Sequence, residues 1–244
     1  MGSILRWSSF AALGLLLWPA VAEAQAPACK IPDRIPVPRL EQPRRDEPVR
    51  KPATTGYLLS MSWSPQHCAG LRNPRDARDR FQCSGENGRF GWVLHGLWPE
   101  TDNPDYPQWC RPAKIVPQPV LRKHLCMTPS AQLLQHEWAK HGTCMSPNPA
   151  AYFRSAEILF RAVRFPDMKA LSRKPQTAAT IRRAFAAANP GIDSTMIAVS
   201  ADKQGWLSEV RLCLGARMKP AKCKAFQTGV KDGRAVRIRR MPTT

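Results

Sequence analysis

Three of the five histidines of this chain lie in two short segments that are dense in polar side chains. The first segment, residues 92–100, contains His95. The second segment, residues 136–144, contains four candidate catalytic groups: His136, Glu137, Lys140 and His141. Because the unperturbed pKa of histidine is about 6.5, one imidazole can be neutral while another is charged at the same pH. The two segments therefore favour acid-base chemistry by paired histidines.

A helix would bring the polar groups of the second segment to one side. With His136 at 0° and about 100° per residue, Lys140 falls at about 40°. Glu137 falls at about 100° and His141 at about 140°. The apolar stripe that includes Trp138 lies directly beside them, so the predicted helix presents all four groups to one site.

The same residues do not fit the common metal motifs. A zinc-protease helix carries histidines at i and i+4, whereas His136 and His141 are five residues apart and diverge by about 140°. The base-deaminase pattern fails as well, because the chain has no P-C-x-x-C segment. A nucleophilic cysteine paired with a histidine stays an alternative, with Cys144 near His141, although every cysteine can be used in a disulfide. We expect no metal and no cofactor.

Cleavage of RNA needs this combination of groups. The 2′-hydroxyl must lose a proton as it attacks the phosphorus, the departing 5′-oxygen must gain one, and the phosphorane needs donors. A 2′-hydroxyl nucleophile would also exclude DNA as a substrate.

The two segments carry a resemblance to a known family. The pattern W-x-x-H-G-L-W-P at 92–99 and the pattern H-E-W-x-K-H-G-T-C at 136–144 resemble, in full, the two active-site segments of the ribonuclease T2 family. Outside these two segments the chain resembles the family more loosely, and the resemblance as a whole covers residues 55–225. The resemblance implies an α+β fold and a metal-independent endoribonuclease of low base specificity that forms a 2′,3′-cyclic phosphate.

The resemblance also implies residue roles. His141 would be the general base and His95 the general acid. His136 would hold the phosphate, and Glu137 with Lys140 would stabilise the phosphorane. The direction of the pKa shift of His141 stays open, because the helix dipole and Glu137 favour its cation while Lys140 and His136 oppose it.

Three residues that follow His95 in the chain are candidates for binding a base. Trp98 follows His95 by three residues and is suited to stacking, and Glu100 and Tyr106 follow in the next loop. The chain has Leu133 and Leu134 where many eukaryotic relatives have aromatic residues. That departure leaves a second base subsite open.

Charge and the first residues indicate an exported protein with a polyanionic partner. The chain has 37 Lys and Arg against 18 Asp and Glu, a net charge of +19. Residues 1–24 resemble a signal peptide, with Arg6, an apolar run and a small-x-small cleavage site at 22–24. We expect no membrane span after its removal, a periplasmic or secreted monomer, and RNA as the partner; a retained anchor is the alternative.

Eight cysteines without a C-x-x-C pair favour four disulfides in an oxidising compartment. The spacing alone leaves the connectivity open. The family resemblance implies the pairs Cys110–Cys144 and Cys213–Cys223. Elimination then leaves two weaker pairs, Cys68–Cys83 and Cys29–Cys126.

The rest of the chain predicts one α+β domain with a central antiparallel sheet flanked by helices and stapled by disulfides. Strands are expected at 57–63, 90–94, 195–199 and 206–214, with the second ending at His95, and helices from 128–130 to Gly142, at 152–163 and at 180–188. Residues 25–54 form an extended, poorly packed Pro-rich leader, and 55–244 form the catalytic domain. The basic tail near 236–238 predicts an edge strand, either a solvated edge or a polyanion-binding strip.

A second hypothesis from another class is a protein that binds polyanions without catalysis. It would use the same basic surface. The complete set of five polar groups argues against it, because binding alone does not require them. The physiological role, such as competition between cells or phosphate scavenging, stays open.

Overall fold

A four-stranded antiparallel sheet forms the centre of the fold. The computed structural model describes residues 29–73, 76 and 79–242. The sheet has the order β2-β1-β5-β4, and its strands are β1 (Gly56–Trp63), β2 (Trp92–Glu100), β4 (Ile197–Ala201) and β5 (Leu207–Gly215). All neighbouring pairs are antiparallel. The predicted α+β class is confirmed, while the expected signal peptide lies outside the described residues.

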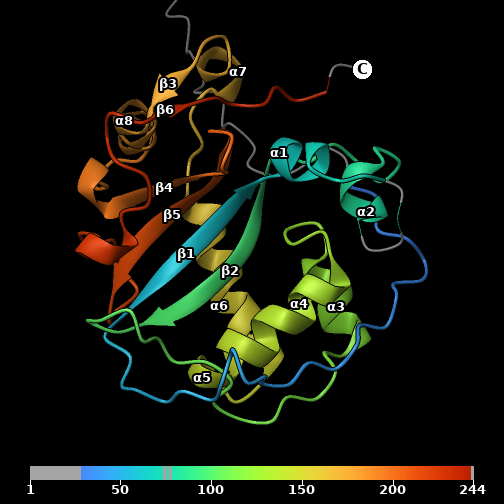
Figure 1. Cartoon of the computed structure of the whole chain (residues 1–244). Coiled ribbons are helices and arrows are strands. Elements are labelled where there is room, and N and C mark those ends of the chain that lie inside the picture. Colours follow the sequence, from blue (N-terminus) through green and yellow to red (C-terminus); the bar gives the residue numbers. More distant parts are fainter. Residues whose placement is uncertain (1–28, 74–75, 77–78, 243–244) are drawn as a thin grey trace, which may run out of the picture.

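Helices cover the sheet and flank its β2 edge (Figure 1). Their bounds are α1 (Ser64–Ala69), α2 (Arg80–Cys83), α3 (Gln118–His124), α4 (Ala131–Glu137), α5 (Thr143–Met145), α6 (Pro149–Ala162), α7 (Met168–Leu171) and α8 (Ala178–Ala188). The shorter elements are β3 (Gln176–Thr177), β6 (Ala235–Val236), and the 3-10 helices η2 (Ser194–Met196) and η3 (Ala225–Gln227). α6 passes behind β1 and β2, α8 packs on β4, and α4 contacts β2.

The core lies between the sheet and α6. Leu59 and Met61 of β1 and Phe153 and Phe160 of α6 are buried in one hydrophobic cluster. α6 begins earlier than the predicted 152, because the side chain of Asn148 caps its first turn by accepting from the backbone of Ala151. The core therefore fixes β1 and β2 against a rigid helix.

β2 departs from its prediction at His95. The strand does not end there but continues to Glu100. In the pairing with β1, Ser60 faces Gly96 and Met61 faces Leu94, so His95 is an extra residue in a β-bulge. A bulge bends the strand and redirects a side chain, and here it leaves the imidazole free of the regular alternation of faces.

The second polar segment is helical, but not as one α-helix. Ser130 caps α4 by accepting from the backbone of Leu133, and residues Trp138–Gly142 (η1) then form a π turn that leads into α5. The prediction that Gly142 ends the helix is wrong. A Cβ at Gly142 would lie 2.5 Å from the Trp138 ring and 2.9 Å from Tyr152, so glycine allows close packing there.

The leader is extended and mostly exposed, as expected, but it is anchored in the core at one point. Apart from one bridging residue, Arg50, residues 29–55 form no helix or strand, yet Ile35 is buried in the main core. In Figure 1 this segment runs past α3 and α4 to the start of β1. The sequence did not reveal this packing, because isolated aliphatic residues among prolines carry no periodicity.

Four disulfides staple the fold, and they coincide with the pairs anticipated from the sequence: Cys29–Cys126, Cys68–Cys83, Cys110–Cys144 and Cys213–Cys223. The Cys110–Cys144 bond ties the loop after β2 to α5. The Cys213–Cys223 bond ties β5 to the segment before η3. Both bonds therefore join elements that surround the same end of the sheet.

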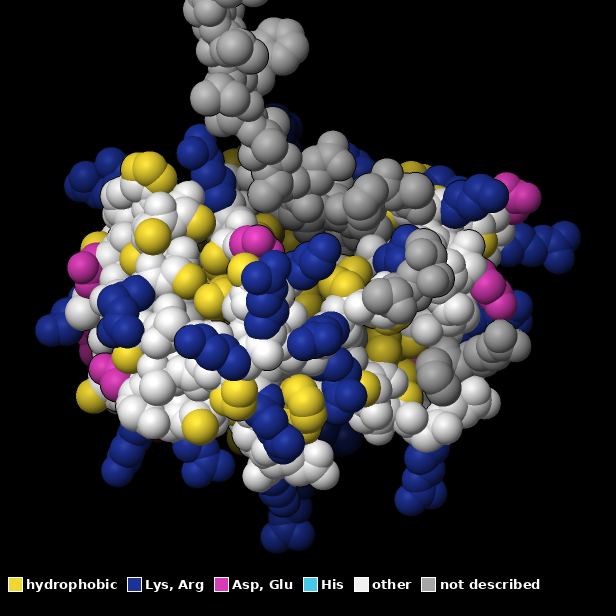
Figure 2. All heavy atoms as spheres, turned by 90° about the horizontal axis from the view of Figure 1, so that it is seen from above, with side chains coloured by type: hydrophobic (Ala, Val, Ile, Leu, Met, Phe, Trp, Pro, Cys, Tyr) yellow, Lys and Arg dark blue, Asp and Glu magenta, His cyan; other side chains and the backbone are white. Residues whose placement is uncertain are grey.

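The tail is less regular than predicted. β6 pairs with β3 and not with the edge of the main sheet, although Arg237 forms a parallel bridge to Trp206. Figure 2 shows many Lys and Arg side chains between hydrophobic ones on the face seen from above, with few acidic side chains. Across the described residues, no helix has the length and apolar composition to cross a bilayer.

Candidate active site

One cavity of about 500 Å³ brings together the eight catalytic and base-binding residues predicted from the sequence. They are His95, Trp98, Glu100, Tyr106, His136, Glu137, Lys140 and His141. They come from β2, from the loop that follows it, and from α4 and the π turn. The bulge in β2 and the π turn thus direct two distant segments into the same space.

The imidazole of His95 is held by a carboxylate that the sequence prediction missed. Its Nδ1 atom shares a hydrogen bond with Glu209 of β5, and Ser62 Oγ of β1 lies 3.4 Å from the same atom. The Nε2 atom lies 3.6 Å from Glu137 Oε1. Burial of the ring acts to lower its pKa, but the hydrogen bond to Glu209 and the charge of Glu137 outweigh it, and the pKa of His95 is raised.

Glu209 is itself fixed in its ionised form. Its second oxygen accepts from Arg211 Nε at 3.1 Å and Nη2 at 2.7 Å. Burial favours the neutral carboxyl, yet the partners His95 and Arg211 lower the pKa of Glu209 to about 2. A fixed negative charge beside Nδ1 stabilises the imidazolium form of His95.

His141 lies in the opposite electrostatic environment. The side chain is buried, and its Nδ1 atom has no hydrogen-bond partner among the described residues. Burial, followed by the positive charges of Lys140, His136 and His95, lowers the pKa of His141 well below its ordinary value. The opposing effects that the sequence left unresolved therefore sum to a lowered pKa for His141, which favours the neutral ring.

Glu137 is buried beside the imidazole of His95. Its Oε2 atom accepts from Trp98 Nε1 at 2.8 Å. A Cβ at Gly96 would collide with that carboxylate and lie 2.6 Å from Trp98 Nε1, so only glycine leaves room for the pair. Burial raises the pKa of Glu137 despite the opposing charges of His95 and His136 and the hydrogen bond from Trp98.

The α-helical wheel overestimates the angle between the two histidines of the second segment. In the π turn, backbone bonds connect residues five apart, so each residue turns by less than the 100° of an α-helix. His136 and His141 both line the cavity as a result. Within the described part of the chain, no group of three or more His, Cys, Asp or Glu side chains is arranged to hold a metal ion.

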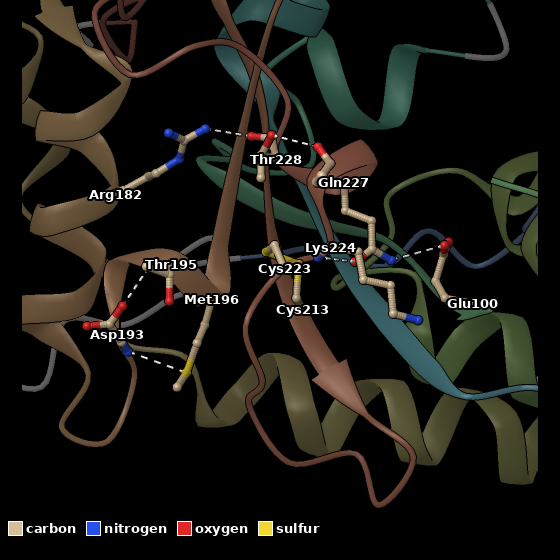
Figure 3. The surroundings of a disulfide bond; sticks show 11 residues. Glu100, Arg182, Asp193, Thr195, Met196, Cys213, Cys223, Lys224, Gln227 and Thr228 are labelled. Atoms are coloured by element: carbon tan, nitrogen blue, oxygen red, sulfur yellow. Dashed lines mark hydrogen bonds between the residues drawn. A yellow bond between two sulfur atoms is a disulfide. The ribbon is translucent and has the colours of Figure 1, made fainter. Parts of the chain in front are cut away.

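Aromatic rings and a buried carboxyl form the other side of the cavity. The ring centres of Trp98 and Tyr106 lie 5.5 and 5.8 Å from that of His141. Glu100 is buried, which raises its pKa, and it accepts from Gln227 Nε2 at 3.2 Å. Figure 3 shows this contact beside the Cys213–Cys223 bond, which fixes the segment that carries Gln227.

Several lining residues escaped the sequence prediction: Leu58, Pro104, Arg211, Phe226 and Gln227. Glu209 and Arg211 alternate with the buried residues of β5, as expected for a strand with one face in the core. They pair in register with Ser62 and Ser60 of β1, so polar residues face each other across two strands. That matched polarity was the available signal. For Phe226, in an irregular segment, the sequence offered none.

Comparison with known proteins identifies the family of the chain. Residues 54–223 match the profile of the Ribonuclease T2 family. The chain belongs to the ribonuclease T2 family. This confirms the family resemblance seen in the two motifs.

Two curated relatives are similar to part of the chain. It is 39% identical to a probable ribonuclease of Haemophilus influenzae over 126 residues, which cover 48% of this chain and 46% of the relative. It is 41% identical to a ribonuclease of Aeromonas hydrophila over 88 residues, 36% of each protein. The chain therefore matches less than half the length of these two relatives.

Solved structures share the T2-family fold over most of the chain. Trichomaglin, described as an S-like ribonuclease, has a TM-score of 0.59 at 22% identity and covers 78% of this chain and 100% of its own. RNase NT, solved in complex with 5′-AMP, has a TM-score of 0.59 at 21% identity, with 77% and 98% covered. These structures establish the fold, and the roles of the cavity residues stay predictions.

Proposed function

We propose that the protein is an endoribonuclease that cleaves single-stranded RNA without a metal, through a 2′,3′-cyclic phosphate and with low base specificity. The observation that carries the proposal is the pair of imidazoles in one cavity whose pKa values are displaced in opposite directions, raised for His95 and lowered for His141. Such a pair supplies a general acid and a general base at the same pH. His141 is therefore assigned as the base and His95 as the acid.

In the first step, neutral His141 takes the proton of the 2′-hydroxyl as its oxygen attacks the adjacent phosphorus. Burial keeps the ring unprotonated before the reaction. Imidazolium His95 then gives a proton to the departing 5′-oxygen, which leaves as an alcohol. Hydrolysis of the cyclic phosphate reverses these two roles, with water in place of the 5′-alcohol.

The other polar groups act on the phosphorane. Burial raises the pKa of Glu137, which favours the form of its carboxyl that can donate a hydrogen bond to a phosphoryl oxygen, and only that protonated form has a donor to offer. Lys140 contributes a positive charge, and both Lys140 and His136 contribute hydrogen-bond donors. Together these groups would stabilise charge that grows only in the transition state.

The substrate preference follows from the same cavity. Trp98, Tyr106 and Phe226 provide aromatic faces, and stacking is tolerant of base identity. The solved structure of RNase NT contains 5′-AMP, which supports nucleotide binding by this fold. DNA would not be cleaved, because it lacks the attacking 2′-hydroxyl.

We further propose that residues 1–24 direct export, that 25–54 form the leader and that 55–244 form the catalytic domain, acting as a periplasmic or secreted monomer. The signal-like sequence and four disulfides support export. Sequencing the N-terminus of protein recovered outside the cytoplasm tests it, and a retained Met1 would contradict it.

The activity is tested by digestion of homopolymeric RNA and matched DNA in the presence of EDTA. We expect cleavage of every RNA homopolymer, 2′,3′-cyclic phosphate ends and intact DNA. Intact RNA, or cleavage that chelation abolishes, would contradict the proposal. RNA and DNA bound equally without cleavage would favour a polyanion-binding protein instead.

A further inference from the structure

The leader supplies two carboxylates to residues of the cavity. Glu41 Oε2 lies 2.6 Å from His136 Nδ1, and Glu47 Oε1 lies 2.6 Å from Lys140 Nζ. Both glutamates precede residue 54, where the match to the family begins. We propose that Glu41 and Glu47 are positioning residues, which hold His136 and Lys140 in place for the reacting phosphate. The inference rests on the proposed function and extends it to a segment outside the family match.

The leader is anchored on both sides of these contacts. At its start, the Cys29–Cys126 disulfide and buried Ile35 hold it to the body of the protein. At its end, Arg50 and Gln108 exchange two backbone hydrogen bonds of 3.0 and 2.9 Å. A segment fixed at both ends holds its side chains at low entropic cost, because its backbone is already ordered.

The carboxylate of Glu41 is aimed by a neighbour on α4. Gln132 donates to Glu41 through Nε2 and accepts from the backbone N–H of Arg39 at 2.8 Å through Oε1. With Nδ1 of His136 bonded to Glu41, Nε2 is the ring nitrogen left to meet a phosphate in the cavity. Glu41 thus fixes both the orientation and the tautomer of the ring.

Glu47 answers the burial of Lys140. The lysine is only 8% exposed, and a buried ammonium group needs a partner. A turn in which Arg44 and Glu47 bond to each other through both backbone groups presents the glutamate to it. The hydrogen bond from Lys140 outweighs partial burial and lowers the pKa of Glu47, so the partner is ionised.

Neither carboxylate blocks the cavity. His136 and Lys140 line it, whereas Glu41 and Glu47 are not among its lining residues. They therefore contact His136 and Lys140 from outside the space that the substrate would occupy. This arrangement suits support of the site and does not suit a strap that competes with RNA.

The test compares E41Q and E47Q with D46N in the full chain. Asp46 is a matched control, because it lies in the same turn and is 77% exposed. With a dinucleoside phosphate as substrate, we expect E41Q and E47Q each to lower kcat/KM about tenfold and D46N to leave it unchanged. In the H136A background, E41Q should have no further effect, and E47Q should have none in the K140A background. A purely structural role would slow both backgrounds further.

A second readout separates this inference from the proposed activity. In ¹⁵N spectra of histidine side chains, the Nδ1–H signal of His136 should be present in the wild type and D46N and lost in E41A, which leaves no acceptor for Nδ1–H, whereas the amide oxygen of E41Q could still accept. If the wild type does not cleave RNA, the proposed function fails and this signal still decides the position of the ring. An unchanged His136 signal in E41A, or faster cleavage by E41Q and E47Q, would overturn the inference.

Discussion

His95 and Glu209, 114 residues apart in the chain, share a hydrogen bond across the central strand β1. The bulge in β2 turns the imidazole toward the sheet face on which Glu209 lies, and Ser62 of β1 completes the contact. This relationship raises the pKa of His95 and so favours its imidazolium form. It also makes the proposed proton donation by His95 depend on a residue that lies far from both motifs in the sequence.

Removing the charge of Glu209 should move the pH profile. In E209Q the imidazolium of His95 loses its stabilising carboxylate, so its pKa falls and the alkaline limb of kcat/KM moves to lower pH. For each pH unit by which the pKa of His95 falls, the rate on the alkaline side drops about tenfold. The control is E157Q, which alters the pair of Glu157 and His124 outside the cavity. An alkaline limb that stays in place in E209Q would contradict the assignment.

The unmodified protein should show a bell-shaped profile. Cleavage rises with pH as His141 deprotonates, and this limb should lie below pH 6.5, since the pKa of His141 is lowered from that value. The falling limb should lie above pH 6.5, where His95, with its raised pKa, loses its proton. Initial rates on a dinucleoside phosphate between pH 3 and 9 measure both limbs. A profile with a single limb, or one in which both limbs lie above pH 6.5, would exclude His141 as the base and His95 as the acid.

Gly96 should be required for catalysis, because only glycine leaves room for the pair of Glu137 and Trp98. In G96A the added methyl group collides with Glu137 and breaks its hydrogen bond to Trp98. We expect kcat to fall by about 10² or more, in the range of a lost general acid or a transition-state donor. G233A serves as control, because a Cβ there meets no atom within 4 Å. Equal activity of the two variants would show that Glu137 can move without loss.

Phe226 should contribute to binding of a base. It is 43% exposed although it is aromatic, and it lines the cavity on the segment fixed by Cys223. Removing a stacking face costs about 1 to 3 kcal/mol, so F226A should raise KM about five- to 150-fold with little change in kcat. I158A, an exposed apolar residue on α6, is the control. An unaltered KM in F226A for all four dinucleotide types would remove Phe226 from the site.

The sequence predicted the local features of the site well because they are local. Both motifs place reactive residues within nine positions of each other, and period-2 alternation identified the strand at 57–63. The eight predicted site residues therefore meet in one cavity. The bulge at His95 and the π turn at Trp138 were missed, because each depends on pairing with β1 or on packing against Tyr152.

The missed residues share a different cause. Glu209, Glu41 and Glu47 act on histidines and a lysine that are 93 to 114 residues away. Charged residues on an alternating strand or in a Pro-rich segment are ordinarily solvated, and only the tertiary fold gives them a buried partner. No pattern within one segment distinguishes these carboxylates from the others.

The central claim is that His95 protonates the leaving oxygen and His141 deprotonates the nucleophile. It is tested most directly by a dinucleotide in which sulfur replaces the bridging 5′-oxygen, because a thiolate leaves without a proton. On the ordinary substrate, H95A and H141A should each be slower than the wild type by about 10² or more. On the sulfur substrate H95A should recover nearly full activity while H141A stays impaired. Recovery of H141A, or impairment of H95A on both substrates, would contradict the account.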